Sequence, residues 1–253
     1  MAVDLINANS TRYYSVPDSA SLTFPDSDWF LAFWTRVDDN SGSFFQYIFS
    51  NNNFAVANSL NIFLQETGAG VPNIWRVTTS TFSQPSSLAP GGDSKDRLVI
   101  VQRNGSNLEL WFCEAHSTAT KEFDSVYSDG AINGGVWNIG RRVDGNTDRY
   151  YEEHFGDIIK GSVTISQSQI ELIARGVPIT QIIDPSKIDV WFQFREASSQ
   201  VVDIINGNIA TRQGSGLLTS EHFPLIGNII SVISSIAAAT AASLLLIQQS
   251  FRQ

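Results

Sequence analysis

The chain has 253 residues, of which 42% are hydrophobic and only 16% are charged, and its net charge is −9. This length can bury a substantial core, and the negative charge argues against nucleic acid as a partner because phosphates would be repelled. The single cysteine, Cys113, excludes an internal disulfide and a multi-cysteine metal site.

Residues 1–219 have the pattern of many short strands separated by polar turns. In chain order we expect strands at residues 21–24, 29–37, 44–49, 60–64, 74–78, 97–102, 107–112, 136–140, 155–165 and 190–194. The pair Asn104-Gly105 between two apolar runs is typical of a β-hairpin. The spacing, without long intervening helices, predicts an all-β antiparallel sandwich.

One short helix is predicted after the strand at residues 155–165. Ser166 is suited to cap it, Gln169 occupies the third helical position of a capping box, and Gly176 is suited to end it. Ile170 and Ile173 are expected to face the core, with Leu172 as a third candidate. We expect this helix to be a structural element at one edge of the sandwich.

Four segments carry a family resemblance. They are residues 21–37, the strand beginning Phe155-Gly156-Asp157, the helix at residues 166–176, and residues 191–211 with Trp191, the run DIING and Thr211. Together they resemble a concanavalin A-like domain of the laminin G and pentraxin type, over roughly residues 1–215. The resemblance implies a jelly roll of two antiparallel sheets. Domains that this chain resembles also occur free-standing in phage and viral structural proteins, and the family includes lectins and glucanases.

Hydrolysis is not favoured by the acidic residues. The resemblance to glucanases would imply two carboxylates at alternate positions of one strand, so that both lie on one sheet face. The densest acidic stretch instead has adjacent residues, Glu152 and Glu153, which would point to opposite faces. We therefore predict that the protein is not an enzyme.

A calcium site is a second hypothesis. Asp144, Asn146 and Asp148 offer oxygen ligands at alternate positions, loosely like the start of a calcium loop. The same residue types also form ordinary turns, which is the favoured interpretation. We therefore predict no obligatory cofactor, with calcium as the one candidate.

Glycan binding is the third hypothesis. Tyr13, Tyr14, Tyr150 and Tyr151 lie beside polar turns, and in each pair only one ring can face inward on a strand. The other ring is available to a sugar or a partner, although a core or ordinary surface position is the favoured interpretation of these tyrosines. Arg141 and Arg142, with Arg149 nearby, are candidates for contacting the ligand or an acidic partner, and a solvated surface is the alternative interpretation.

The C-terminal segment, residues 220–253, is predicted to be a separate hydrophobic helix. No side chain from His222 to Phe251 is formally charged. In heptad register one core position holds Ile226, Ile233, Thr240 and Ile247, and the other holds Ile229, Ile236, Ser243 and Ser250. Isoleucine at both positions favours three- or four-stranded assemblies, and a homotrimer is our first hypothesis.

A membrane is the alternative partner of this segment. As a helix, residues 225–247 would be long enough to cross a hydrocarbon layer of roughly 30 Å. Asn228 and the many serines weaken the lipid interpretation, because polar groups in hydrocarbon are costly. Burial in a protein assembly is therefore favoured.

Together these features predict a non-enzymatic virion protein from a bacteriophage, with the role of capsid decoration or attachment. The lectin-like domain would lie on the virion exterior, docked to capsid or other virion proteins, and would bind a glycan on a host surface. A surface-anchored or secreted lectin is the alternative, although the first residues lack the features of a signal peptide. A glycoside hydrolase ranks third.

Overall fold

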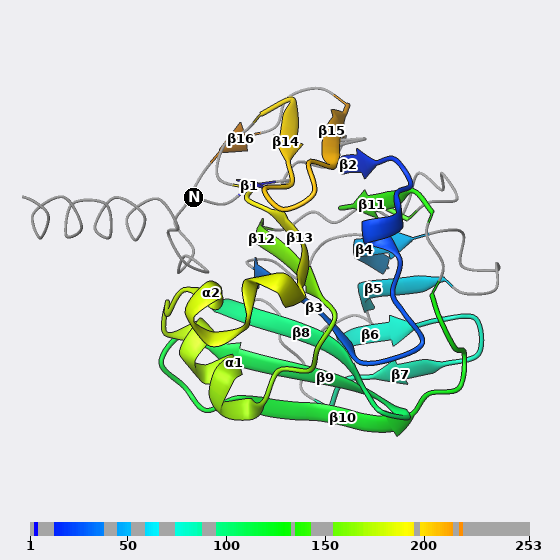
Figure 1. Cartoon of the computed structure of the whole chain (residues 1–253), viewed down its shortest axis with the longest axis vertical. Coiled ribbons are helices and arrows are strands. Elements are labelled where there is room, and N and C mark those ends of the chain that lie inside the picture. Colours follow the sequence, from blue (N-terminus) through cyan, green and yellow to red (C-terminus); the bar gives the residue numbers. More distant parts are fainter. Residues whose placement is uncertain are drawn as a thin grey trace, which may run out of the picture.

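A computed structural model of the chain describes residues 3–4, 13–37, 45–51, 59–65, 74–87, 95–132, 135–142, 154–194, 198–214 and 218–219. Within these residues two antiparallel sheets pack face to face, and two short helices cover the outside of one of them (Figure 1). The predicted all-β sandwich is confirmed. The predicted C-terminal helix, residues 220–253, lies outside the described residues, and the domain boundary at residue 219 stays a prediction.

Sheet A carries the helices. In the described residues its strand order is β10-β9-β8-β3-β12-β1-β16, and β13 also pairs with β12. Its strands are β1 (Val3–Asp4), β3 (Trp29–Arg36), β8 (Asp96–Asn104), β9 (Asn107–Glu114), β10 (Thr120–Val126), β12 (His154–Gly161), β13 (Ile188–Phe192) and β16 (Leu218–Thr219).

Sheet B forms the other layer. Its order in the described part of the chain is β14-β15-β2-β11-β4-β5-β6-β7. Its strands are β2 (Tyr13–Val16), β4 (Phe45–Asn51), β5 (Leu60–Gln65), β6 (Ile74–Thr78), β7 (Ser83–Pro85), β11 (Trp137–Ile139), β14 (Gln200–Val202) and β15 (Ile209–Gln213).

Strand β3 shows why a strand at the centre of sheet A has a long apolar run, here residues 29–34. Alternate residues of a strand face opposite sides of the sheet. Trp29, Leu31 and Phe33 join the core between the two sheets, while Phe30 and Trp34 join a second core under the helices. Because both faces are covered, this run has no polar side.

The predicted helix is confirmed as α1 (Gln167–Ala174), and α2 (Ile179–Ile182) follows it. Ser166 caps α1 and forms the capping box with Gln169. The helix ends in a Schellman motif, because Gly176 has a φ of +86° and the Val177 amide donates to the Leu172 carbonyl at 3.0 Å.

Three expectations are corrected. Residues 21–24 are not a strand, because Ala20–Leu22 form a 3-10 turn and Phe24 makes only an isolated bridge to Ile132. Leu172 does not face the core, because it is 40% exposed on the side of α1 opposite Ile170 and Ile173. The strand expected at residues 155–165 ends at Gly161.

The hairpin expected at Asn104-Gly105 joins β8 to β9. Asn104 and Asn107 are paired across the sheet, so only Gly105 and Ser106 form the turn. Gly105 has a φ of +60° at the first central position, as type II′ turns require.

Candidate functional site

The outer face of sheet B carries a row of aromatic and basic side chains. Tyr47 on β4 is paired with Phe63 on β5, and Phe63 is paired with Arg76 on β6. A bulge between Tyr47 and Phe49 makes this row possible. Phe49 faces the inter-sheet core, and the extra residue turns Tyr47 to the opposite side.

A row of small polar residues runs beside it through directly paired positions. Its members are Gln200, Thr211, Ser15, Asn138, Ser50, Asn61, Thr78 and Ser83. Within it, the Ser50 hydroxyl donates to Asn61 Oδ1 at 2.7 Å. Aromatic and hydrogen-bonding side chains therefore lie next to each other on this face of the sheet.

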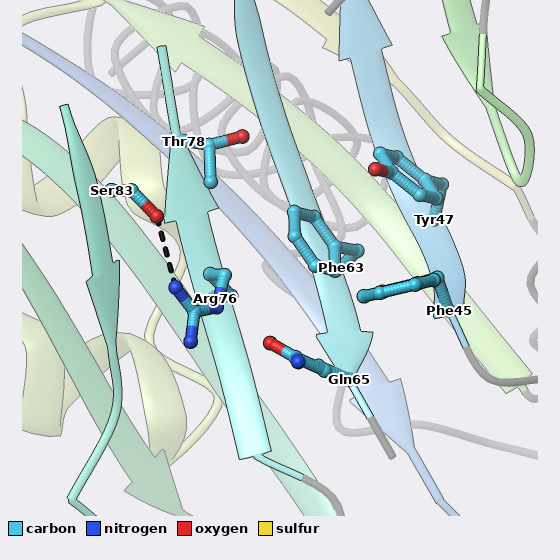
Figure 2. A pocket seen from close by; sticks show the side chains of 7 residues that line it. All are labelled: Phe45, Tyr47, Phe63, Gln65, Arg76, Thr78 and Ser83. Atoms are coloured by element: carbon cyan, nitrogen blue, oxygen red, sulfur yellow. Dashed lines mark hydrogen bonds between the residues drawn. The ribbon is translucent and has the colours of Figure 1, made fainter. Parts of the chain in front are cut away.

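The two rows meet in a pocket of about 340 Å³, shown in Figure 2. This lies within the roughly 300–1,000 Å³ of small-molecule sites. Side chains from β4, β5, β6 and β7 line it, and the described ones are Phe45, Tyr47, Phe63, Gln65, Arg76, Thr78 and Ser83.

The aromatic side of the pocket is a packed group of three rings. Tyr47 and Phe63 stack with ring centres 4.5 Å apart and 20° between their planes. Phe45 meets Phe63 edge-on at 5.7 Å. Phe45 is half-buried, whereas Tyr47 and Phe63 are buried. Phe45 is therefore the ring most accessible to a ligand.

The polar side of the pocket has groups with unmet hydrogen-bonding capacity. Arg76 donates from Nη1 to the Ser83 hydroxyl at 2.9 Å. Its Nε and the hydroxyl of Thr78 are buried, and neither has a hydrogen-bond partner among the residues that the structure describes. Thr78 is only 1% exposed. A buried polar group of this kind costs about 1–3 kcal/mol until it is satisfied.

The structure separates the tyrosines expected at a binding site. Tyr14 faces the inter-sheet core, fully buried, and its hydroxyl donates to the Ser198 carbonyl at 2.9 Å. Burial also raises the pKa of Tyr14 to about 12. This position excludes Tyr14 from a surface site and corrects its assignment as a ligand residue. Tyr13 is half-buried on the outer face, as alternation requires.

The two predicted arginines lie against these aromatic rings. The Arg141 guanidinium carbon is 4.8 Å from the ring centre of Tyr13. That of Arg142 is 5.8 Å from the ring centre of Tyr47, beside the pocket. The structure thus places Arg142 against Tyr47, one of the rings that line the pocket, while Tyr13 and Arg141 form a separate pair.

The remaining predicted site residues lie outside the described residues. They are Tyr150 and Tyr151 for ligand binding, Asp144, Asn146 and Asp148 for calcium, and Ile226, Ile229, Ile233, Ile236 and Ile247 for assembly. The adjacent acidic residues Glu152 and Glu153 also lie outside the described residues. In the described parts of the chain, no three histidine, cysteine or acidic side chains group as metal ligands. No helix in those parts is long and apolar enough to cross a membrane.

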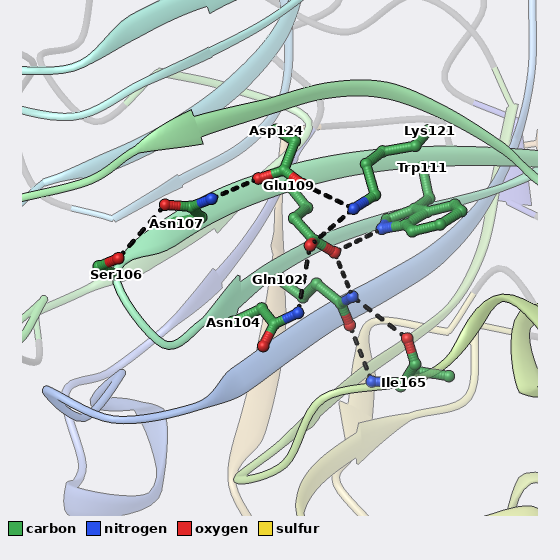
Figure 3. A network of polar contacts seen from close by, with 9 residues as sticks. All are labelled: Gln102, Asn104, Ser106, Asn107, Glu109, Trp111, Lys121, Asp124 and Ile165. Atoms are coloured by element: carbon green, nitrogen blue, oxygen red, sulfur yellow. Dashed lines mark hydrogen bonds and ion pairs between the residues drawn. The ribbon is translucent and has the colours of Figure 1, made fainter.

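The buried acidic groups of sheet A are held by hydrogen bonds. Glu109 is 2% exposed and accepts from Gln102, Asn104, Trp111 and Lys121 at 2.7–3.2 Å, as Figure 3 shows. Burial by itself raises the pKa of Glu109, but the four hydrogen bonds outweigh it and bring the pKa below its usual value. Glu109 is therefore ionised at neutral pH, and its carboxylate is occupied by four hydrogen-bond donors.

The other conspicuous carboxylates of the resemblance motifs are also structural. Asp157 accepts from the Trp191 indole at 3.1 Å. Asp203 accepts from the backbone amides of Trp191, Ile205 and Asn206 at 2.7–3.1 Å. The Asp203 contacts fix the turn between β14 and β15 to β13, whereas the Asp157 contact joins β12 to β13.

The comparisons with known proteins concern the fold. No protein-family model and no curated protein matches the chain. Among solved structures, a proposed carbohydrate-binding protein from Bacteroides ovatus is similar with a TM-score of 0.60 and 15% identity, covering 89% of this chain and 61% of the other. This chain thus spans about three fifths of the length of the Bacteroides protein.

Two further structures are similar. The SAP-like pentraxin of Limulus polyphemus matches with a TM-score of 0.52 and 12% identity, over 83% of this chain and 94% of the pentraxin. A bacteriophage tailspike protein matches with a TM-score of 0.49 and 13% identity, over 76% of this chain and 29% of the tailspike. With its two antiparallel sheets and the capped helix on sheet A, the chain has the concanavalin A-like jelly-roll fold.

Proposed function

We propose that the chain is a non-catalytic glycan-binding protein and that the pocket on sheet B holds the sugar. The observation that carries this proposal is the pocket itself, where the Phe45, Tyr47 and Phe63 rings lie beside the hydrogen-bonding groups of Arg76 and Thr78. The likeness to a proposed carbohydrate-binding protein supports the fold as a suitable scaffold.

The chemistry of the pocket suits a pyranose ring. One face of such a ring presents C–H groups that pack on an aromatic ring, and its edge presents hydroxyls that both donate and accept hydrogen bonds. Phe45 offers accessible aromatic surface, and Gln65, Thr78 and Ser83 offer polar groups at the pocket wall. A largely apolar pocket with a few well-placed polar groups is the usual form of a small-ligand site.

Catalysis finds no support at this pocket. Glycoside hydrolysis ordinarily needs two carboxyl groups on either side of the scissile bond. None of the described lining residues is acidic, and the buried Glu109 lies on the other sheet. We expect no release of reducing sugars from β-glucans, and activity abolished by Glu152→Gln or Glu153→Gln would contradict this.

Glycan-array binding of the full chain tests the proposal. Phe45→Ala should lower the apparent affinity for the bound glycans about tenfold, which is roughly 1.4 kcal/mol. Leu172→Ala is the matched control, since it truncates an exposed apolar side chain on α1 and should leave binding unchanged. Binding to no glycan, or equal binding by Phe45→Ala with an unchanged melting temperature, would overturn the proposal.

We further propose that this domain lies on the exterior of a virus particle and is docked through residues 220–253. The uncharged stretch from His222 to Phe251 supports this, because it needs a covering partner surface. Antibodies against the chain should label intact particles in electron micrographs. Labelling of cell surfaces alone would favour the surface-anchored lectin. Sedimentation of the full chain in solution tests whether it forms a homotrimer.

A further inference from the structure

We propose that the pocket on sheet B selects an acidic sugar residue and that Arg76 binds its carboxylate. This inference rests on the proposed function and names the class of sugar. Arg76 is the only charged side chain among the described residues that line the pocket. It stands on β6, directly opposite Phe63 of the aromatic group.

Arg76 differs from six other described cations, each of which is paired with a carboxylate. Arg36, Lys95, Arg97, Arg103, Lys121 and Lys160 each form an ion pair with a carboxylate. Among the described residues no carboxylate pairs with Arg76, although acidic residues outnumber basic ones 25 to 16 in the chain. Its hydroxyl partner Ser83 leaves the positive charge uncompensated.

The geometry of the guanidinium favours a carboxylate. Arginine presents its N–H groups in a planar fork that matches the two oxygens of a carboxylate. Nη1 is engaged by Ser83, while Nε is buried without a partner in the described residues. A carboxylate on the ligand would supply both the missing acceptor and the missing negative charge. Arg142, beside Tyr47, places a second cation next to the pocket.

Thr78 points independently to a bound polar ligand. Its side chain lines the same pocket, is 1% exposed and has a hydroxyl without a partner in the described residues. A hydroxyl can both donate to and accept from a sugar hydroxyl. A uronic acid satisfies all three features at once, because it has a pyranose face, ring hydroxyls and a carboxylate on the ring.

The test compares acidic and neutral forms of one ligand. Uronic-acid oligosaccharides bound by the full chain are reduced at the carboxyl to the matching neutral sugars, and both forms are titrated by calorimetry. We expect carboxyl reduction to weaken binding by about tenfold or more, as loss of a charged hydrogen-bonding partner does. Methyl β-D-glucuronide and methyl β-D-glucoside serve as the simplest probe pair.

Variants assign the effect to Arg76. Arg76→Met should remove the preference for the acidic form, and Arg76→Lys should restore only part of it because lysine lacks the fork. Lys95→Met is the matched control, since it removes one exposed positive charge just before β8 of the other sheet and should keep the preference. Circular dichroism and melting temperature check that each variant folds.

Two outcomes would overturn the inference and they are distinguishable. If the array shows glycan binding that depends on Phe45 but neutral sugars bind as well as acidic ones, the acidic preference is wrong and the proposed function stands. If Arg76→Met keeps the preference in a folded protein, Arg76 is not the group that binds the carboxylate. Absence of all glycan binding would overturn the proposed function itself.

Discussion

Two groups of buried polar side chains, one around Glu109 on sheet A and one around Arg76 on sheet B, differ in how far their hydrogen bonds are satisfied. On sheet A, Glu109 accepts four hydrogen bonds, and Gln102 continues the network to the backbone of Ile165 just before α1. On sheet B, the buried polar atoms of Arg76 and Thr78 lack partners in the described residues. A satisfied network rigidifies a fold, whereas a buried polar group without a partner calls for an explanation, of which a bound water, ion or ligand is one.

This difference separates a structural site from a candidate binding site more clearly than residue type does. Judged by residue type alone, the group formed by Glu109, Lys121 and Trp111 would be taken for a catalytic or binding site. Lys121 lies 4.9 Å from the centre of the Trp111 ring and donates to both Glu109 and Asp124. The polar groups of these residues thus satisfy one another's hydrogen bonds. Three predictions test the comparison.

The largest effect is expected from Glu109→Ala. It would leave the side-chain donors of Gln102, Asn104 and Trp111 without their common acceptor, while Lys121 keeps Asp124. Each buried donor left unsatisfied costs about 1–3 kcal/mol. Urea unfolding followed by circular dichroism measures the loss. Glu114→Ala is the control, because Glu114 pairs with Lys95 and Arg97 at a more exposed position and should cost under about 1 kcal/mol. Equal losses would contradict the central role of Glu109.

A smaller effect is expected on acidification. The folded-state pKa of Glu109 is lowered, so its contribution to stability is present above the unfolded pKa of about 4.3 and is lost as the pH falls through the folded pKa. Glu109→Gln, which cannot ionise, should show a shallower decline in melting temperature below about pH 4.3. Parallel declines in the two proteins would show that other groups govern acid unfolding.

The smallest effect on stability is expected from Thr78→Val. Replacing an unsatisfied buried hydroxyl with a methyl group should leave the free energy of unfolding unchanged or raise it by up to about 1 kcal/mol, while glycan affinity falls. Thr35→Val is the matched control, because the Thr35 hydroxyl donates to the His154 carbonyl at 3.0 Å and its loss should destabilise the fold. Destabilisation of Thr78→Val as large as that of Thr35→Val would show that Thr78 is structural.

Local features were predictable wherever neighbouring residues carry the whole signal. The cap at Ser166, the glycine at position 176 and the hairpin at Asn104-Gly105 all follow from contacts within a few residues. The prediction of a strand at residues 21–24 is wrong, because Phe24 is buried by the inter-sheet core and not by strand pairing. Strand β10 escaped prediction because its residues are largely polar and exposed at the sheet edge.

From the sequence, only the kind of side chain at the pocket could be predicted, namely aromatic and basic residues, and not which residues form it. The alternation rule required one residue of the Tyr13-Tyr14 pair to face inward, but only the packing of Tyr14 on Phe155 and Phe194 shows which one. Phe63 and Arg76 were not candidates, since nothing near them in the sequence marks a site. A pattern in β5 or β6 alone signals no more than a half-buried strand.

The sequence by itself determined the class of fold, the capped helix and the tight hairpin, because short-range hydrogen bonds and the period of apolar residues specify them. Tertiary structure decided which polar groups are satisfied and which side chains meet. Side chains from β4 to β7 converge only after the sheet has formed. The bulge after Tyr47 reverses the face that alternation would assign, and a single strand's sequence does not reveal a bulge that its partner strand defines.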